Sequence, residues 1–247
     1  MPEIKERPIL FSAPMVRAIL EGRKTVTRRP LKPLAVELIE YHAGIPTEDS
    51  QAEVDFQYAT YFDDERKEIG PEWLCSSSDY PEEGVVPFGQ CPYGKPGDRL
   101  WVRETFIDLR GTGVEHRPDP DGPLQRYAYA ADCRPGSHSD GARKDFGLKY
   151  KPSIHMPRAA CRILLEISHV RVERLQDISE DQAEAEGVRL MRDGSDTWVS
   201  REGPGNLVTP WPTAKEAFSD LWNSINGPHA WAANPWVWAV SFKRVTP

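Results

Sequence analysis

The sequence predicts an α+β fold in which a small closed β-barrel is flanked by helices and carries large loop insertions. One indication is the segment 160–174, where the alternating apolar residues change phase near 168–169, as at a bulge or corner that lets a small barrel close. A second is the apolar segment 236–242, which predicts a final strand. The third is a pair of capping-box sequences, beginning at Ser179 and Thr213, each of which predicts the start of a helix.

At 247 residues the chain is long enough for one large domain or two small ones, and we expect a single domain over residues 1–247. The chain has 39% hydrophobic and 28% charged residues, so it can bury a core but is polar overall. No apolar run approaches the length of a membrane span, and no signal peptide opens the chain. We therefore expect a cytoplasmic protein without a membrane partner.

Four widely spaced cysteines, Cys75, Cys91, Cys133 and Cys161, include no CxxC pair. Reduced thiols are the expected state of such cysteines in the cytoplasm. A zinc site made of Cys75, Cys91 and Cys133 with a histidine is conceivable but has no spacing signature. We expect neither a metal nor a cofactor.

Charge is distributed unevenly along the chain. Residues 1–36 contain eight Lys or Arg and three Glu, a net charge of +5, whereas residues 37–90 contain two basic and fourteen acidic residues, a net charge of −12. A general nucleic-acid-coating surface needs a continuous positive track, which this pattern does not supply. The basic region favours a local anionic or nucleotide-like ligand, and the acidic block is equally typical of a solvated loop.

The N-terminal elements are read in order as a strand at 8–11 and a short helix. Ser12 can cap this helix, Pro14 suits its first turn, and Gly22 can end it in the left-handed conformation. Apolar residues recur at helical spacing within it, at Met15, Val16, Ile19 and Leu20. Two prolines, Pro30 and Pro33, are expected to end regular structure.

The middle of the chain is expected to hold two insertions, at about 37–90 and 107–150. Turn residues at 91–98 lead into an alternating strand at 99–106, on which Arg103 and Glu104 point to opposite faces. Loops at 107–126 and 133–153 surround a short strand at 127–131.

The C-terminal third predicts two helices and a strand. The helix that begins after Ser179 is short, because Gly187 stops it, and the helix after Thr213 carries a long apolar stripe. Three tryptophans near the final strand, Trp231, Trp236 and Trp238, are expected in the core, with base stacking as the alternative.

The segment 22–29, GRKTVTRR, carries the strongest chemical signal. Lys24 and Thr27 leave a helix end together, and a lysine can act as a base for a hydroxyl when burial or neighbouring cations lower its pKa. Arg23, Arg28 and Arg29 are such neighbours and can also hold an anion. The alternative is a solvated basic turn.

Glu186 lies in the last turn of the short helix after Ser179. The helix dipole disfavours a carboxylate at this end, which suits a general acid or a proton shuttle. An exposed glutamate at a frayed helix end explains the pattern as well.

Three segments together resemble the ASCH family: 22–29 its signature, 97–104 (GDRLWVRE) its second strand motif, and 236–242 (WVWAVSF) its closing strand. The whole chain is similar to the long ASCH proteins carried by bacteriophages and prophages, with insertions at about 37–90 and 107–150. This resemblance implies a PUA-like β-barrel, a fold shared with RNA-binding modules.

The resemblance also implies a reaction. Small bacterial ASCH proteins hydrolyse the amide of N4-acetylcytidine with a lysine, a threonine and a glutamate. The first two match Lys24 and Thr27, and the glutamate aligns best with Glu186, with Glu184 as the alternative. The substrate-binding residues expected from the motifs are Gly22, Arg23, Arg29, Arg103 and Glu104.

Three functions are carried forward. The first is an amidohydrolase acting on an acylated or otherwise modified nucleoside or base. The second is a PUA-like module that binds RNA or modified nucleic acid without turnover. The third is a ribonuclease that uses the same Lys and Arg cluster on a phosphodiester. The expected partner is a modified nucleoside or a nucleic acid.

Overall fold

The computed structural model describes residues 4–43, 54–63, 65–77, 84–117, 121–191, 194–201 and 208–246. Its strands are β1 (Glu6–Leu10), β2 (Val26–Pro30), β3 (Val54–Phe62), β4 (Glu68–Ser77), β5 (Val86–Gly89), β6 (Arg99–Arg103), β7 (Phe106–Asp108), β8 (Tyr127–Tyr129), β9 (Leu164–Arg174), β10 (Arg189–Leu190), β11 (Trp198–Val199), β12 (Pro210–Trp211) and β13 (Trp236–Val245). Its α-helices are α1 (Ala13–Leu20), α2 (Pro33–Ala43), α3 (His138–Asp145), α4 (Glu180–Ala185) and α5 (Ala214–Asn226). The fold is mixed α+β, as predicted, and its strands form several sheets instead of one barrel.

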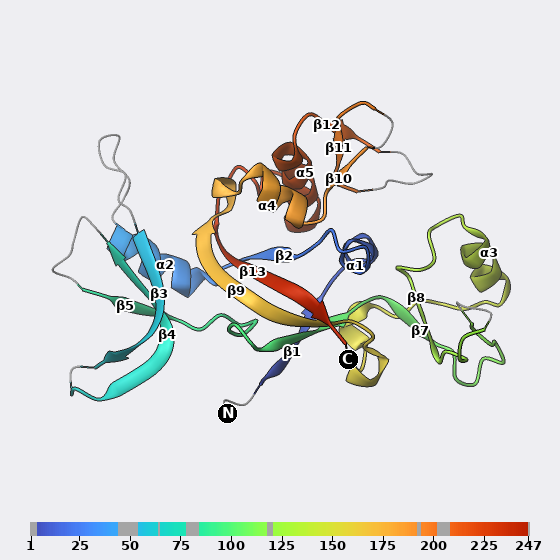
Figure 1. Cartoon of the computed structure of the whole chain (residues 1–247), viewed down its shortest axis with the longest axis horizontal. Coiled ribbons are helices and arrows are strands. Elements are labelled where there is room, and N and C mark those ends of the chain that lie inside the picture. Colours follow the sequence, from blue (N-terminus) through green and yellow to red (C-terminus); the bar gives the residue numbers. More distant parts are fainter. Residues whose placement is uncertain are drawn as a thin grey trace.

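The main sheet has five strands in the order β1-β6-β9-β13-β2. The edge strand β1 runs parallel to β6, and the other pairs are antiparallel. The long strands β9 and β13 lie side by side and curve through the centre of the molecule (Figure 1). The four strands predicted for the barrel therefore share one sheet, and β2 extends it.

The predicted closure into a barrel is not observed among the described residues. The strands β1 and β2 end the strand order, and no backbone ladder joins them in the described part of the chain. Instead, the Arg29 guanidinium of β2 donates a 2.7 Å hydrogen bond to the Leu10 carbonyl at the end of β1. A side chain thus occupies the position where a barrel would have its last row of backbone hydrogen bonds.

The predicted change of phase in the long strand is confirmed as a β-bulge. Ser241 of β13 pairs with His169, and the next residue, Phe242, pairs with Ile167, so that Ser168 is left over on β9. An extra residue on one strand bends it and increases its twist, which explains the curvature of the central pair.

The region predicted as an acidic insertion lies outside the main sheet, as expected, but its described part is more regular than predicted. Strands β3, β4 and β5 form a separate antiparallel sheet. Pro33, expected to end regular structure, is the first residue of α2, a position where proline loses no hydrogen bond. Residues 44–53, 64 and 78–83 of this region lie outside the described residues.

Aromatic side chains join this second sheet to the main one. The ring of Trp238 on β13 lies 5.4 Å from that of Trp73 on β4 and 5.8 Å from that of Phe88 on β5, measured between centroids. Trp236 contacts Phe56 in the same way at 5.3 Å. Trp236 and Trp238 are buried and Trp231 is partly buried, so the prediction that they belong to the core is confirmed.

The second predicted insertion also contains regular structure. The strand expected at 127–131 is β8, which pairs with β7, and the strand expected at 99–106 is interrupted after Arg103. The segment 133–153 was predicted as loop but contains α3, where the Ser137 hydroxyl accepts a hydrogen bond from the Asp140 amide. Residues 118–120 are outside the described part.

The two helices predicted from capping-box sequences, α4 and α5, are present and cover one face of the main sheet. Ser179 and Gln182 form the complete capping box of α4, and the Glu180 carboxylate accepts hydrogen bonds from the first amides of α5. Thr213 accepts from the Glu216 amide at the start of α5. Within the described residues, no helix combines the length and the apolar character that a membrane crossing requires.

Replacing Trp238 tests the aromatic joint between the two sheets. Trp238→Ala removes a core ring that is 3% exposed and contacts the second sheet, so we expect a loss of about 3–5 kcal/mol in the free energy of unfolding, measured with urea. Phe62→Ala, at a ring that is 69% exposed, should change stability by less than about 0.5 kcal/mol. Equal losses in the two variants would contradict the assignment of Trp238 to this joint.

Candidate functional site

Lys24 is buried by the way in which the chain leaves α1. Gly22 has a φ of +76°, the left-handed conformation predicted for it, and Ser12 precedes the helix without a side-chain cap. The amides of Arg23 and Lys24 then both donate to the Ala18 carbonyl, at 2.9 and 3.0 Å. This tight turn directs the Lys24 side chain into the protein instead of into solvent.

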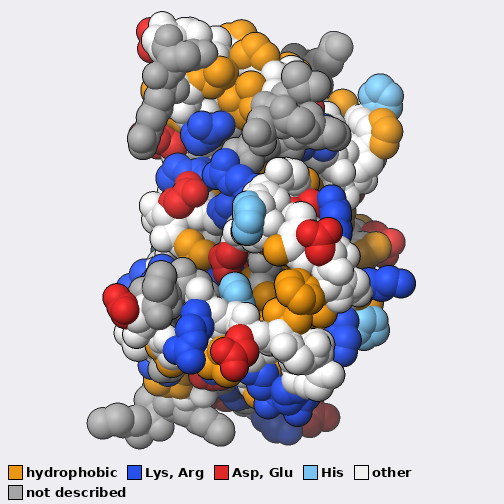
Figure 2. Space-filling model, turned by 90° about the vertical axis from the view of Figure 1, so that its right-hand side faces the viewer, with side chains coloured by type: hydrophobic (Ala, Val, Ile, Leu, Met, Phe, Trp, Pro, Cys, Tyr) orange, Lys and Arg blue, Asp and Glu red, His pale blue; other side chains and the backbone are white. Residues whose placement is uncertain are grey.

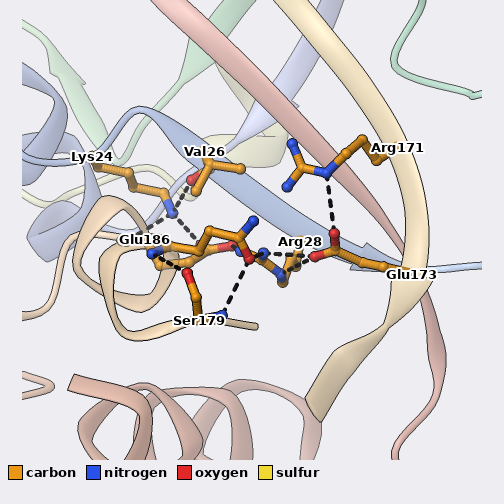
Figure 3. Close-up of polar contacts among 8 residues, drawn as sticks. Lys24, Val26, Arg28, Arg171, Glu173, Ser179 and Glu186 are labelled. Carbon is orange, nitrogen blue, oxygen red and sulfur yellow. Dashed lines mark hydrogen bonds and ion pairs between the residues drawn. The ribbon is translucent and has the colours of Figure 1, made fainter. Parts of the chain in front are cut away.

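The Lys24 ammonium has three acceptors within hydrogen-bond distance (Figure 3). Its Nζ lies 2.6 Å from Glu186 Oε2, 2.9 Å from the Glu186 carbonyl oxygen and 2.8 Å from the Val26 carbonyl oxygen. The Lys24 side chain is 0% exposed and that of Glu186 is 3% exposed. The alternative of a solvated basic turn is therefore wrong for Lys24.

Burial lowers the pKa of the Lys24 amine below its ordinary value. Loss of hydration is the largest cause, the Glu186 carboxylate opposes it, and the charges of Arg29 and Arg28 lower the pKa further. Arg23 was expected to contribute, but its guanidinium instead binds the Gly187 carbonyl and the Glu21 carboxylate.

Glu186 lies at the end of α4, as predicted, where it is the C-cap residue. Its carboxylate is buried and has a cation on each oxygen, Lys24 on Oε2 and Arg28 on Oε1 at 3.2 Å. The alternative of an exposed glutamate at a frayed end is thus wrong. The helix-dipole argument omitted these two partners, which lie far from Glu186 in the sequence.

Arg28 extends the pair into a network that sequence reasoning did not assign. Its guanidinium, 0% exposed, contacts Glu173 at 2.6 Å and the Gln182 amide oxygen at 2.8 Å. Glu173 also accepts a hydrogen bond from Arg171 at 3.2 Å. The only sequence signal for this network was the alternation along β2, which puts Arg28 on the face opposite Thr27 and Arg29.

Thr27 lies on the other face of β2. It pairs with Val240 of β13, whereas Arg28 pairs with Ala239, and directly paired residues of antiparallel strands share a face. Thr27 is 2% exposed, and among the described residues its hydroxyl makes no hydrogen bond. Arg29 shares this face, and its Nε is buried without a partner in the described part of the chain.

Lys24 lies between the two faces. Its Nζ is 5.7 Å from the centroid of the Phe11 ring, which is also 5.5 Å from Arg29 Cζ. The Val26 carbonyl that accepts from Lys24 belongs to the peptide group that leads into Thr27. The structure thus joins Lys24 directly to Glu186 and brings it within one peptide group of Thr27.

Gly187 allows α4 to approach this closely. It has a φ of +102°, and a Cβ placed on it would lie 3.0 Å from Ala18 Cβ and 3.1 Å from Lys24 Cβ. The backbone of the α4 terminus therefore packs directly on the Lys24 side chain. The sequence identified Gly187 only as the residue that stops the helix.

A cavity of about 580 Å³ adjoins the buried pair. Glu186, Glu184, Gly187 and Arg23 are among its lining residues, whereas Lys24 and Thr27 are not. Glu186 thus lines the cavity and also contacts the buried lysine. Glu184, the alternative to Glu186, has no contact with Lys24 among the described residues.

The remaining predicted substrate-binding residues make other contacts. Arg103 stacks over the Trp101 ring and donates to the Ile154 carbonyl. Glu104 is buried in an ion pair with Arg162, and burial raises its pKa while Arg162 opposes the shift. Neither contacts Lys24 or Glu186 in the part of the chain that the structure describes.

The four cysteines are free thiols, and two of them are buried. Cys75 and Cys91 belong to the main core, where burial raises the pKa of each thiol to about 11, and Cys133 is partly exposed. Searching the described residues finds no group of three His, Cys, Asp or Glu side chains placed to hold a metal ion.

Substituting Gly187 tests the packing of α4 on Lys24. In Gly187→Ala the energetic cost of the positive φ adds to the cost of the close Cβ contacts. We therefore expect the free energy of unfolding to fall by about 3 kcal/mol. The matched variant is Gly22→Ala, because Gly22 has a φ of +76° but open space around it, and it should cost about 1 kcal/mol. Urea unfolding of both variants measures the difference, and equal losses would refute the packing role.

The lowered pKa of Lys24 predicts a pH dependence of stability. Between the lowered folded pKa and the usual 10.5, the unfolded state binds more protons, so the Lys24 contribution to stability rises with pH in that window. The free energy of unfolding of the wild type, relative to Lys24→Met, should therefore increase as the pH rises toward 10.5.

Lys243→Met, at a lysine that is 64% exposed, serves as the reference in the same urea titrations. Its difference from the wild type should stay constant over this range. A constant or falling difference for Lys24→Met would show that the folded protein does not favour the neutral amine.

Comparisons with protein-family models, curated proteins and solved structures found no match to this chain. The similarity to ASCH proteins therefore depends on the three sequence motifs.

Proposed function

We propose that the protein is an amidohydrolase that removes the acyl group from a modified nucleoside or base such as N4-acetylcytidine. The observation that carries this proposal is the buried contact between Lys24 Nζ and Glu186 Oε2 at 2.6 Å, next to a cavity that Glu186 lines. A lysine kept out of water with a lowered pKa is suited to accept a proton. With this function we infer a PUA-like fold of the ASCH type, of which the five-stranded sheet is the core.

In this mechanism Lys24 is the base, Thr27 the nucleophile and Glu186 the proton shuttle. The neutral amine takes the Thr27 hydroxyl proton while Thr27 Oγ1 bonds to the amide carbonyl carbon. The C–N bond then breaks, and the leaving amine takes a proton through Glu186, which leaves an acyl-threonine ester. Water, deprotonated by the same Lys24 and Glu186 pair, releases the acid and restores Thr27.

Two unpartnered groups on the Thr27 face support these roles. The Thr27 hydroxyl makes no hydrogen bond among the described residues, so it is not committed to another partner. The buried Arg29 Nε lacks an acceptor there and can donate to a developing oxyanion. For the reaction, the Lys24 amine exchanges the Val26 carbonyl for the Thr27 hydroxyl, since catalytic contacts often tighten only with substrate bound.

The other two functions predict different behaviour of the same residues. A binding module without turnover needs Lys24 only as a positive charge, and its affinity should weaken steeply with salt. A ribonuclease would act on a phosphodiester and leave N4-acetylcytidine intact. Neither uses an acyl-threonine.

Variants of Thr27 and Lys24 test the mechanism with little change of shape. Thr27→Val keeps the β-branched side chain but removes the nucleophile, and Lys24→Met keeps the length but removes the base. Each should lower turnover of N4-acetylcytidine about 10²–10⁴-fold in single-turnover assays. Thr27→Ser should retain activity, and Thr25→Val, at an exposed neighbouring threonine, should match the wild type.

Lys24→Arg separates the base from the charge. A guanidinium keeps the positive charge but does not deprotonate, so turnover should be lost as in Lys24→Met. Mass spectrometry of the Thr27→Ser protein after mixing should show one added acetyl group on residue 27. Wild-type turnover in Thr27→Val, or in a folded Lys24→Arg protein, would refute the amidohydrolase proposal.

A further inference from the structure

The cavity beside Glu186 has an excess of basic over acidic lining residues, although the protein has a net charge of −7. Its described lining contains five arginines against three glutamates. The arginines are Arg17, Arg23, Arg134, Arg189 and Arg201. On the face shown in Figure 2, Lys and Arg side chains gather below the part of the molecule that holds α5 and β10 to β12. Since these arginines come from separate segments of the chain, the fold concentrates positive charge around one cavity.

The cavity also has an apolar wall. Met15 from α1, Val188 and Val199 near the short strands, and Leu221 from α5 line it together with the arginines. Aliphatic side chains can cover the face of a planar base, and guanidinium groups bind phosphate oxygens through paired N–H donors. This combination fits a ligand with one flat, weakly polar part and one strongly anionic part.

From these features we propose that the cavity binds the substrate as a nucleotide, with the arginines holding a phosphate group attached to the nucleoside. The inference depends on the proposed function for the base that is deacylated, and it adds the phosphate as a recognised part of the substrate. Glu186 lines the cavity and contacts Lys24, so it links the phosphate-binding cavity to the proposed catalytic lysine.

The size and charge of the site favour a mononucleotide over a polynucleotide. A volume of about 580 Å³ is typical of a site that encloses one small molecule. The acidic segment 37–90, with a net charge of −12, prevents a continuous positive track along the chain. A polynucleotide would need such a track to hold its successive phosphates.

Equilibrium binding of the reaction products tests the inference without any turnover. Cytidine, cytidine 5′-monophosphate and a short single-stranded RNA containing one cytidine are titrated into the protein by calorimetry. We expect the monophosphate to bind at least about 10-fold more tightly than cytidine, because charge-assisted contacts to the phosphate are added.

Arg201→Gln should remove much of this advantage. Arg201 is 49% exposed and lies 3.7 Å from Asp220, so the substitution leaves the core intact. We expect the monophosphate affinity to fall several-fold and the cytidine affinity to stay the same. The matched control is Arg126→Gln, since Arg126 is 43% exposed and 3.6 Å from Asp108 but lies outside the cavity. This control should bind both ligands as the wild type does.

Equal affinity for cytidine and its monophosphate, or tighter binding of the RNA than of the monophosphate, would overturn the inference. An equal effect of Arg201→Gln and Arg126→Gln would also overturn it. The amidohydrolase proposal is judged separately by release of acetate from N4-acetylcytidine. Hydrolysis without a phosphate preference removes only the inference, and a phosphate preference without hydrolysis removes only the proposed function.

Discussion

The burial of Lys24 against Glu186 is the interaction on which the site depends. Removing a lysine and a glutamate from water costs several kcal/mol per ion, and only a close pair with further hydrogen bonds offsets this. The protein supplies these bonds through two backbone carbonyls and through Arg28 on the second carboxylate oxygen. The path of the chain around the pair follows from that requirement. The tight turn after α1 directs Lys24 inward. Because Gly187 has no Cβ, the end of α4 can pack closely on the Lys24 side chain.

Strand β2 connects this pair to the rest of the fold. It is an edge strand of the main sheet, so its two faces present different residues to different environments. One face directs Arg28 toward α4, and the other directs Thr27 and Arg29 toward the main core and Phe11. Thr25, directly before β2, connects α4 to β13. Its amide donates a hydrogen bond to the Ala185 carbonyl of α4, and its carbonyl accepts one from the Phe242 amide of β13. Lys24 lies next to this junction.

The acidic insertion packs against the main sheet and is a structural part of the fold. The described part of the acidic region forms a sheet whose aromatic rings contact Trp236 and Trp238 of β13. These contacts stabilise β13, the strand that pairs with β2. None of the insertion's described residues lines the arginine-rich cavity, because that lining comes from the N-terminal and C-terminal parts of the chain and from Arg134. Acidic and basic surfaces are thus built from different segments of the chain.

The sequence by itself determined the elements that depend on local patterns. Capping boxes located α4 and α5, the change of phase located the bulge at Ser168, and Gly22 located the end of α1. It also identified Lys24 and Glu186 as candidate site residues, but only the resemblance to ASCH proteins indicated that the two act together. The tertiary structure decided what depends on distant contacts: the sheet in the acidic region, the open edge between β1 and β2, and the network of Arg28 with Glu173. Local propensity reports which residues can start, stop or bend an element, whereas the burial of a charge and the identity of its partner are set by segments that meet only after folding.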